Sequence, residues 1–159
     1  MNVPEYVANQ TERIAEALAH FVATTKEDKL DWQPTQEGHA PCRSVYQQIS
    51  ECVVVNRVFA RMLRGEIESA PLGERPEITF ASPQDAQEQL LASARELAEA
   101  LRGLSDADLA REYKHPRGTM RGENFILMAY RNMAYHAGQI NFIQTLYGDT
   151  EFHVPSNWR

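Results

Sequence analysis

Hydrophobic residues recur at helical spacing in four long stretches of this chain. In the first stretch, Val7, Ile14, Leu18 and Phe21 follow one another at steps of seven, four and three residues. These steps are typical of an amphipathic helix that buries one face. The pattern therefore predicts a first helix over residues 3–24.

A second helix is predicted to begin after Ser44, or a residue or two earlier, and to end at Gly65. One face of this helix carries mostly apolar residues at the same kind of spacing: Val45, Ile49, Cys52, Asn56, Phe59 and Leu63. The residues between the first two helices are interrupted by prolines and a glycine. They predict a loop after one short helical turn, anchored by Leu30 and Trp32.

The third helix has the clearest start signal, because Ser82, Pro83 and Asp85 form a cap, a first-turn proline and a first-turn carboxylate. It is predicted to end at Gly103. Residues 65–81 lack a sustained period and contain several prolines and glycines, so they form the longest connection in the chain. Connections of this length often cross over a helical bundle.

The last helix is predicted over residues 123–147, after a brief turn and a polar connection that precede it. Its buried face is expected to comprise Ala129, Met133, His136, Ile140 and Ile143. We find no internal repeat and no convincing alternation of the kind that strands show. The predicted class is all-α, a four-helix bundle with a long crossover connection, formed by residues 1–159 as one domain.

Composition narrows the possible functions. The chain has 159 residues, of which 43% are hydrophobic and 24% are charged, as in ordinary globular proteins. Its formal net charge is −6 and its basic residues are scattered, so a nucleic-acid partner is not expected. No segment has the length and hydropathy of a membrane helix or the order of a signal peptide. We therefore expect a cytoplasmic protein without membrane or nucleic-acid partners.

Polar residues on the buried faces are the candidates for chemistry, because burying an unpaired polar group costs free energy. Glu51 directly precedes the apolar run CVVVN, so it needs a partner. His136 lies at the centre of the last helix's apolar face, and Asn132 precedes it by one turn. These three side chains form the candidate site.

Two interpretations of this candidate site remain open. A carboxylate oxygen, an amide oxygen and an imidazole nitrogen could hold a divalent cation with open positions, although an amide is the weakest of these ligands. Alternatively, Glu51 accepts hydrogen bonds from Asn132 and His136 and neutralises a buried polar layer. Two other histidines have simpler explanations. His20 is expected to form an exposed pair with Glu16, and His39 to be solvated in a loop.

Several motifs resemble those of the DinB-like (YfiT-like) superfamily. The ending NMAYHAGQINFIQTLYGD is similar to that family's last helix, and RSVYQQISECVVVNRVFARMLRG is similar to its second helix. LDWQP and GLSDADL extend the resemblance over most of the chain. The resemblance implies the same bundle fold.

The resemblance also implies a site and a range of activities. The family's three histidine ligands correspond to Glu51, Asn132 and His136, so only one of the three is a histidine here. The resemblance implies a metal-dependent enzyme, thiol-transferase or hydrolase-like, with zinc, nickel, manganese or iron at altered ligands and a small-molecule substrate. The alternative is a non-catalytic binding or structural bundle with a degenerate, metal-free site. A homodimer through the first and third helices is also expected.

Overall fold

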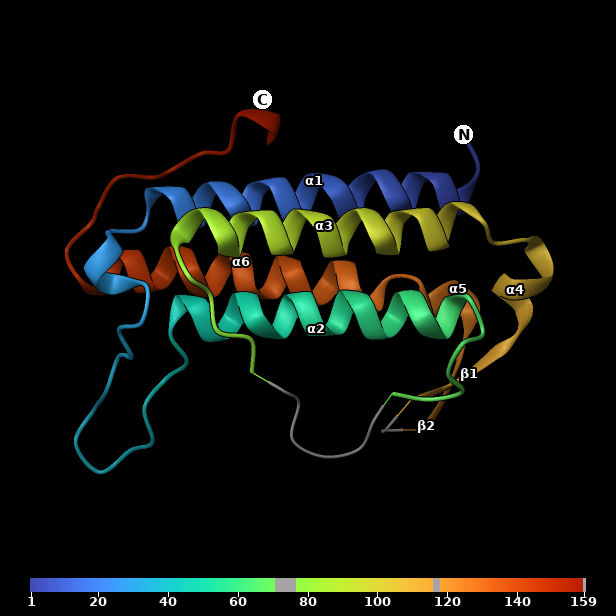
Figure 1. Ribbon diagram of the computed structural model, residues 1–159, viewed down its shortest axis with the longest axis horizontal. Coiled ribbons are helices and arrows are strands. Elements are labelled where there is room, and N and C mark those ends of the chain that lie inside the picture. Colours follow the sequence, from blue (N-terminus) through green and yellow to red (C-terminus); the bar gives the residue numbers. More distant parts are fainter. Residues whose placement is uncertain (71–76, 116–117, 159) are drawn as a thin grey trace.

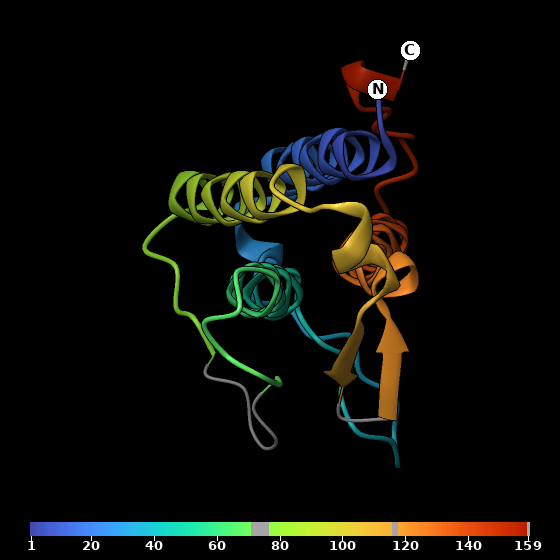
Figure 2. The same ribbon diagram turned by 90° about the vertical axis from the view of Figure 1, so that its right-hand side faces the viewer.

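The computed structural model describes residues 1–70, 77–115 and 118–158. Four long helices, α1 (Val3–Thr24), α2 (Val45–Leu63), α3 (Pro83–Arg102) and α6 (Met128–Leu146), lie side by side (Figure 1). Helices α1 and α2 each pack against both α3 and α6. Seen end on, the four helices occupy the corners of a square (Figure 2). The predicted four-helix bundle is confirmed.

The helices begin at the capping residues that the sequence indicates. Ser44 Oγ accepts a hydrogen bond from the Gln47 backbone N–H, and the Gln47 side-chain oxygen accepts one from the Ser44 N–H, which forms a capping box. Ser82 accepts a bond from the Asp85 N–H at 3.1 Å. Gly65 follows α2 with a φ of +74°, a backbone conformation that favours glycine. Local sequence signals therefore fix the ends of α2 and α3 well.

A crossover connection joins α2 to α3. These two helices run in the same direction (Figure 1), so the chain between them has to return along the bundle. Residues 71–76, within this connection, lie outside the described residues. Further along, the Ile78 N–H donates to Ser50 Oγ of α2 at 2.7 Å, and the Phe80 ring lies 5.4 Å from that of Tyr46. The end of the connection is thus fastened to α2.

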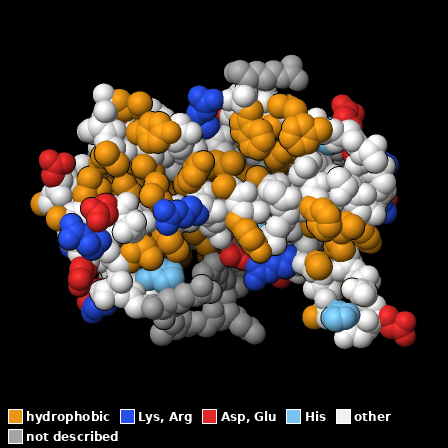
Figure 3. Space-filling view, turned by 180° about the vertical axis from the view of Figure 1, so that it is seen from behind, with side chains coloured by type: hydrophobic (Ala, Val, Ile, Leu, Met, Phe, Trp, Pro, Cys, Tyr) orange, Lys and Arg blue, Asp and Glu red, His pale blue; other side chains and the backbone are white. Residues whose placement is uncertain are grey.

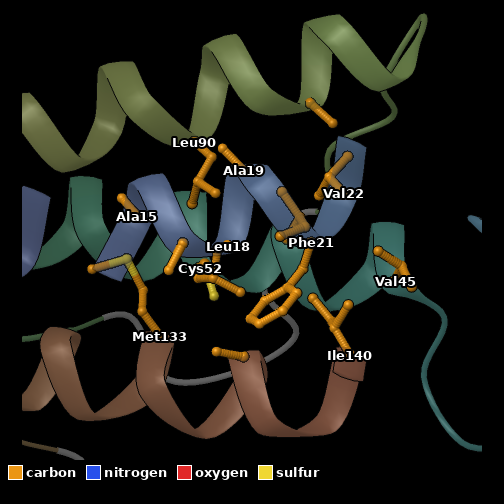
Figure 4. Packing of buried hydrophobic residues seen from close by; sticks show 14 of the residues in the cluster. Ala15, Leu18, Ala19, Phe21, Val22, Val45, Cys52, Leu90, Met133 and Ile140 are labelled. Carbon is orange, nitrogen blue, oxygen red and sulfur yellow. The ribbon is translucent and has the colours of Figure 1, made fainter. Parts of the chain in front are cut away.

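The core extends along the whole bundle. One cluster surrounds Phe21 and includes Leu18, Cys52, Met133 and Ile140 (Figure 4). A second cluster fills the end nearer the hairpin, and its larger members are Phe59, Leu97, Leu101 and Phe125. All residues predicted for the apolar faces of α2 and α6 are buried. In the described part of the chain, no helix combines the length and hydropathy needed to cross a membrane.

Two short helices and the C-terminal tail complete the packing around α1. The 3₁₀ helix η1 (Glu27–Lys29) lies between α1 and α2, and Leu30 after it is buried, as predicted. A second 3₁₀ helix, η2 (Ser156–Trp158), ends the described chain. The Trp158 ring meets Phe21 edge-on, and the Asn157 side chain donates to the Arg13 carbonyl at 2.9 Å. The tail therefore packs against α1.

The segment before the last helix differs from the prediction of a polar connection. After α4 (Asp106–Ala110), strands β1 (Glu112–His115) and β2 (Gly118–Arg121) form an antiparallel hairpin. The Tyr113 ring stacks on Phe125 at 4.4 Å, and Phe125 stacks on Phe59 at 4.7 Å. Four-residue strands are too short to show a clear alternation. This hairpin is fastened by tertiary stacking, which sequence periodicity does not reveal.

The predicted last helix is divided in two. Helix α5 (Gly122–Phe125) precedes α6, and the break falls at residues 126–127. There the Leu127 N–H bonds to the Asn124 carbonyl, three residues back, instead of four. Phe125 and Ile126, which are consecutive in the sequence at this break, are both buried.

We predict that Gly122→Ala destabilises the protein. A Cβ at this position would lie 2.2 Å from the Asp108 carbonyl oxygen and 2.9 Å from Leu109 Cα, both of which are backbone atoms. Forcing α4 away should lower the free energy of unfolding by about 1–3 kcal/mol. Gly138→Ala on α6 is the matched control, because nothing lies within 4 Å of its Cβ position. Chemical denaturation measures both, and equal stability of the two variants would contradict the prediction.

Candidate functional site

A cavity of about 440 Å³ lies between α2, α6 and the loop that precedes α2. Its polar wall consists of Arg43, Gln48, Glu51, Asn132, His136 and Gln139. Its remaining wall consists of Pro34, Cys42, Tyr135, Phe142, Ile143 and Leu146. Among the described residues, the crossover connection contributes nothing to this lining.

The imidazole of His136 is fixed by two glutamine side chains. His136 is 3% exposed, and its Nδ1 lies 2.9 Å from Gln139 Oε1 and 3.1 Å from Gln48 Oε1. The Gln48 amide nitrogen donates to the Arg43 carbonyl at 3.3 Å, which directs the Gln48 oxygen toward the imidazole. Both neighbours of Nδ1 are acceptors, so Nδ1 carries the proton and donates it. The lone pair of the neutral ring is therefore on Nε2.

Nε2 of His136 faces the carboxylate of Glu51. The distance from Nε2 to Glu51 Oε1 is 3.7 Å, which is too long for a direct hydrogen bond. Burial lowers the pKa of His136, the hydrogen bond to Gln139 raises it, and the positive charge of Arg43 lowers it further. Burial is the largest of the three effects. His136 is therefore a neutral imidazole at neutral pH, with an unprotonated nitrogen beside a carboxylate.

Arg43 is the charged partner of Glu51. Its guanidinium forms an ion pair with Glu51 Oε2, while the other carboxylate oxygen faces His136. The Glu51 side chain is 19% exposed and that of Arg43 is 60% exposed, so the ion pair extends from the cavity to the solvent. The guanidinium supplies the positive charge that a partly buried carboxylate requires.

Asn132 lines the same cavity but its amide is directed elsewhere. Its Nδ2 lies 3.8 Å from Cys52 Sγ, the partner to which it donates. Cys52 is fully buried, and burial raises the pKa of its thiol. The sulfur is therefore a neutral thiol that packs and accepts a weak hydrogen bond, and it is not a reactive thiolate.

The residues at this site do not fit a divalent cation well. The described residues contain no group of three His, Cys, Asp or Glu side chains that could hold a metal. His136 Nε2 and Glu51 Oε1 give two donors, but the same carboxylate already pairs with a guanidinium. A dication would lie next to that positive charge and would have an amide as its third protein ligand. The donor set and the local charge both argue against metal binding.

The structure therefore brings together part of the predicted set. Glu51 and His136 face each other across the α2–α6 interface, and Asn132 shares their cavity, where its amide nitrogen donates to Cys52 Sγ. His39 is exposed in the loop before α2. His20 is half-buried on α1 with its ring 6.2 Å from that of Phe21, and it does not line the cavity.

Sequence reasoning missed three residues of the site: Arg43, Gln48 and Gln139. Gln48 precedes Glu51 by three residues, so both are on one helix face, and the same spacing relates Gln139 to His136. Those spacings could have indicated the two glutamines. Arg43 precedes the α2 cap, in a loop, where no periodicity gives the direction of a side chain.

Comparison with known families identifies this architecture. The family model of the DinB superfamily matches residues 10–140. This chain belongs to the DinB superfamily. The matched range includes most of α1, all of α2 and α3, and the part of α6 that carries the cavity's polar residues. A search of curated proteins finds no match.

Solved structures share the DinB-superfamily fold. YfiT from Bacillus subtilis, described as a probable metal-dependent hydrolase with an unusual four-helix bundle topology, is 17% identical. The comparison covers 93% of this chain and 90% of YfiT, with a TM-score of 0.73. The DinB-like protein YjoA from the same organism is 15% identical over 95% and 96% of the two chains, with a TM-score of 0.65. A conserved protein from Enterococcus faecalis is 14% identical over 92% of this chain and 97% of its own, with a TM-score of 0.67.

We predict that His136 titrates below the ordinary histidine value of 6.5 and stays the Nδ1–H tautomer when neutral. At pH values between the folded-state pKa and 6.5, His136 is protonated more in the unfolded chain than in the folded protein. The stability that His136 contributes is complete above 6.5 and is lost as the pH falls toward the folded-state value. Nitrogen-15 NMR of the imidazole measures both tautomer and pKa.

Gln139→Leu is the matching variant, because it removes a bond that favours the charged imidazole. The His136 pKa should fall further in this variant, whereas Gln84→Leu, exposed on α3, should leave it unchanged. A higher His136 pKa in Gln139→Leu would show that Gln139 does not accept from Nδ1.

Proposed function

We propose that this protein is a hydrolase-like enzyme for a small molecule, in which His136 is the general base. The observation that carries the proposal is the pair of amide oxygens beside His136 Nδ1, from which the Nδ1–H tautomer follows. The Nδ1–H of His136 is held by two amide oxygens, and its unprotonated Nε2 points toward Glu51 and the cavity. An enzyme base needs this combination of a defined lone pair and a pKa below the working pH.

The proposed step uses the gap between His136 and Glu51. A water within hydrogen-bond distance of both Nε2 and Glu51 Oε1 fits the 3.7 Å separation. As the water oxygen forms a bond to an electrophilic carbon of the substrate, such as an ester carbonyl carbon, its proton passes to Nε2. When the bond from that carbon to the leaving oxygen breaks, the imidazolium returns the proton to this oxygen, and the leaving group departs as a neutral alcohol. The imidazolium that forms is stabilised by the Glu51 carboxylate and by the Gln48 and Gln139 oxygens. A thiol in place of this water would give thiol transfer by the same proton movement.

Arg43 holds Glu51 in place for this step. Its ion pair takes one carboxylate oxygen and leaves the other directed at His136. We assign Arg43 and Glu51 the role of positioning the water and the imidazole. The proposal gives no role to a metal ion, because the donor set does not fit one.

YfiT's description as a probable metal-dependent hydrolase supports the reaction class. Two of the three positions that the family resemblance assigns to histidine ligands are Glu51 and Asn132 here. We infer that this chain has kept the site and changed how the attacking group is activated. Zinc, nickel, manganese or iron at Glu51, Asn132 and His136 remains the competing hypothesis, and metal analysis tests it.

A non-catalytic binding protein is the second candidate. The observation that favours it is the mutual pairing of the polar residues, since Glu51 pairs with Arg43 and Asn132 with Cys52. A fully paired polar layer can be purely structural. Turnover therefore has to be measured separately from binding.

We predict that His136→Gln lowers kcat/KM about 100-fold or more for hydrolysis of the best chromogenic ester found in a substrate panel. Glutamine has no basic nitrogen, so the proton acceptor is lost. His20→Gln, outside the cavity, is the control and should keep full activity. The wild-type rate should rise with pH through the His136 pKa, below 6.5, and then level off.

A second arm of this experiment addresses metals. Activity should survive chelation, and purified protein without a histidine tag should hold less than one equivalent of zinc, nickel, manganese or iron. Activity that disappears with chelator and returns with one of these ions would overturn the metal-free mechanism. Turnover unaffected by His136→Gln would overturn the general base, whereas a wild-type protein without turnover would leave the binding protein as the explanation.

We also propose that the protein is a homodimer, as the family resemblance implies, although the candidate face differs from that expected. Val3 and Tyr6 at the start of α1 are 58% and 52% exposed, whereas α3 has no large exposed hydrophobic side chain in its described residues. Burial of these α1 residues against a second copy would remove apolar surface from water. Light scattering should give twice the 18.1 kDa chain mass. Tyr6→Ser should shift it toward one chain, and a monomer in both proteins would refute the dimer.

A further inference from the structure

Three exposed apolar residues of α6 line the cavity beside the polar site. Tyr135, Phe142 and Leu146 are 65%, 62% and 49% exposed, and they succeed one another at steps of seven and four residues. They therefore lie on one helix face. The back view of the molecule, onto the side that carries α6, shows hydrophobic side chains over much of the surface (Figure 3). The mechanism proposed above uses none of these three residues.

The cavity changes in polarity along α6. Asn132, His136 and Gln139 come first, and Phe142, Ile143 and Leu146 follow them along the helix. Leu146 comes ten residues after His136, which corresponds to about 15 Å of helix. A molecule lying along this wall meets hydrogen-bonding groups at one end and only apolar side chains at the other.

The charged residues that line the cavity indicate which kind of head group such a molecule would have. Arg43 and Glu51 are the lining residues that carry full charges, and they neutralise each other. His136 is neutral, and its Nε2 can only accept a hydrogen bond. An ionic head group would lose hydration without gaining an unpaired opposite charge, which is costly. A neutral donor, in contrast, matches the Nε2 lone pair.

We propose that a ligand of this site is a neutral amphiphile, whose hydroxyl or thiol donates to His136 Nε2 in the place of the attacking water and whose alkyl or aryl tail lies along Phe142 and Leu146. This inference rests on the proposed function, because it names the substrate class of the same cavity. The tail gives binding energy by burying apolar surface, and the head places its reactive group beside the base. The cavity's paired charges then discriminate against fatty acids and alkylamines of the same length.

Calorimetry with simple probes tests the class. Butanol, hexanol and octanol should bind the wild-type protein with affinity rising about three- to fourfold per added methylene. Octanoate and octylamine, which have eight carbons as octanol does but carry a charged head group, should bind at least about tenfold more weakly. Tighter binding of either ion than of octanol would overturn the neutral head, and affinity independent of chain length would overturn the tail site.

Two exposed phenylalanines provide matched variants. Phe142→Ser should weaken octanol binding about tenfold, whereas Phe152→Ser should not, because Phe152 is equally exposed, at 63%, and lies in the tail outside the cavity. Both positions are on the surface, so both variants should fold. If Phe142→Ser instead converts a dimer to a monomer and leaves octanol affinity unchanged, a second copy covers this face and the ligand proposal fails.

His136→Gln separates this inference from the proposed function. The variant keeps the apolar wall, so the dependence of affinity on chain length should persist while ester turnover is lost. If His136→Gln abolishes turnover and the affinity for the alcohols does not depend on their chain length, only the amphiphile proposal is refuted. Selective octanol binding together with unchanged turnover in His136→Gln would refute only the general base.

Discussion

The site depends on one buried imidazole that can satisfy only one of its nitrogens within the protein. Gln48 from α2 and Gln139 from α6 both accept from His136 Nδ1, and Gln48 is itself held by the Arg43 carbonyl. The ring thereby joins the loop before α2, α2 itself and α6. Because burial makes the protonated ring costly, the same contacts that fix its tautomer leave Nε2 as an uncharged acceptor facing the cavity.

The identity of the positive charge beside Glu51 decides what chemistry is open to the site. A divalent cation and a guanidinium can each stabilise a partly buried carboxylate, but only the cation acts as a Lewis acid on a bound water. A guanidinium cannot lower the pKa of water in this way, because it has no empty coordination position. With Arg43 on Glu51, the proposed mechanism assigns activation of the attacking group to His136.

The sequence predicted the features that depend on local capping residues or on helical spacing. It did not predict the features that depend on contacts between distant residues. Ser44 and Ser82 mark helix starts through bonds within four residues, and the faces of α2 and α6 follow from helical spacing. Glu51 and His136 were expected to meet because the two stretches that carry them resemble the family at its ligand positions. Arg43 could not be predicted, since its direction depends on a loop. The direction of the Asn132 amide and the stack of Tyr113 on Phe125 depend on neighbours more than ten positions away.

The polar side chains between α2 and α6 form a seam, which consists of Gln48, Glu51, Asn132, His136 and Gln139. The position of this seam explains how the bundle tolerates it. One core cluster surrounds Phe21 and Ile140, and another lies at Phe59 and Phe125, so apolar packing holds α2 and α6 at two separate levels. The seam between these helices then need not provide stability of its own, and its side chains can be chosen for hydrogen bonding. The cost falls on packing, since amides and a carboxylate interdigitate less well than apolar side chains. The cavity lies at this seam, so the polar side chains that hold the proposed base also border the space proposed for its ligand.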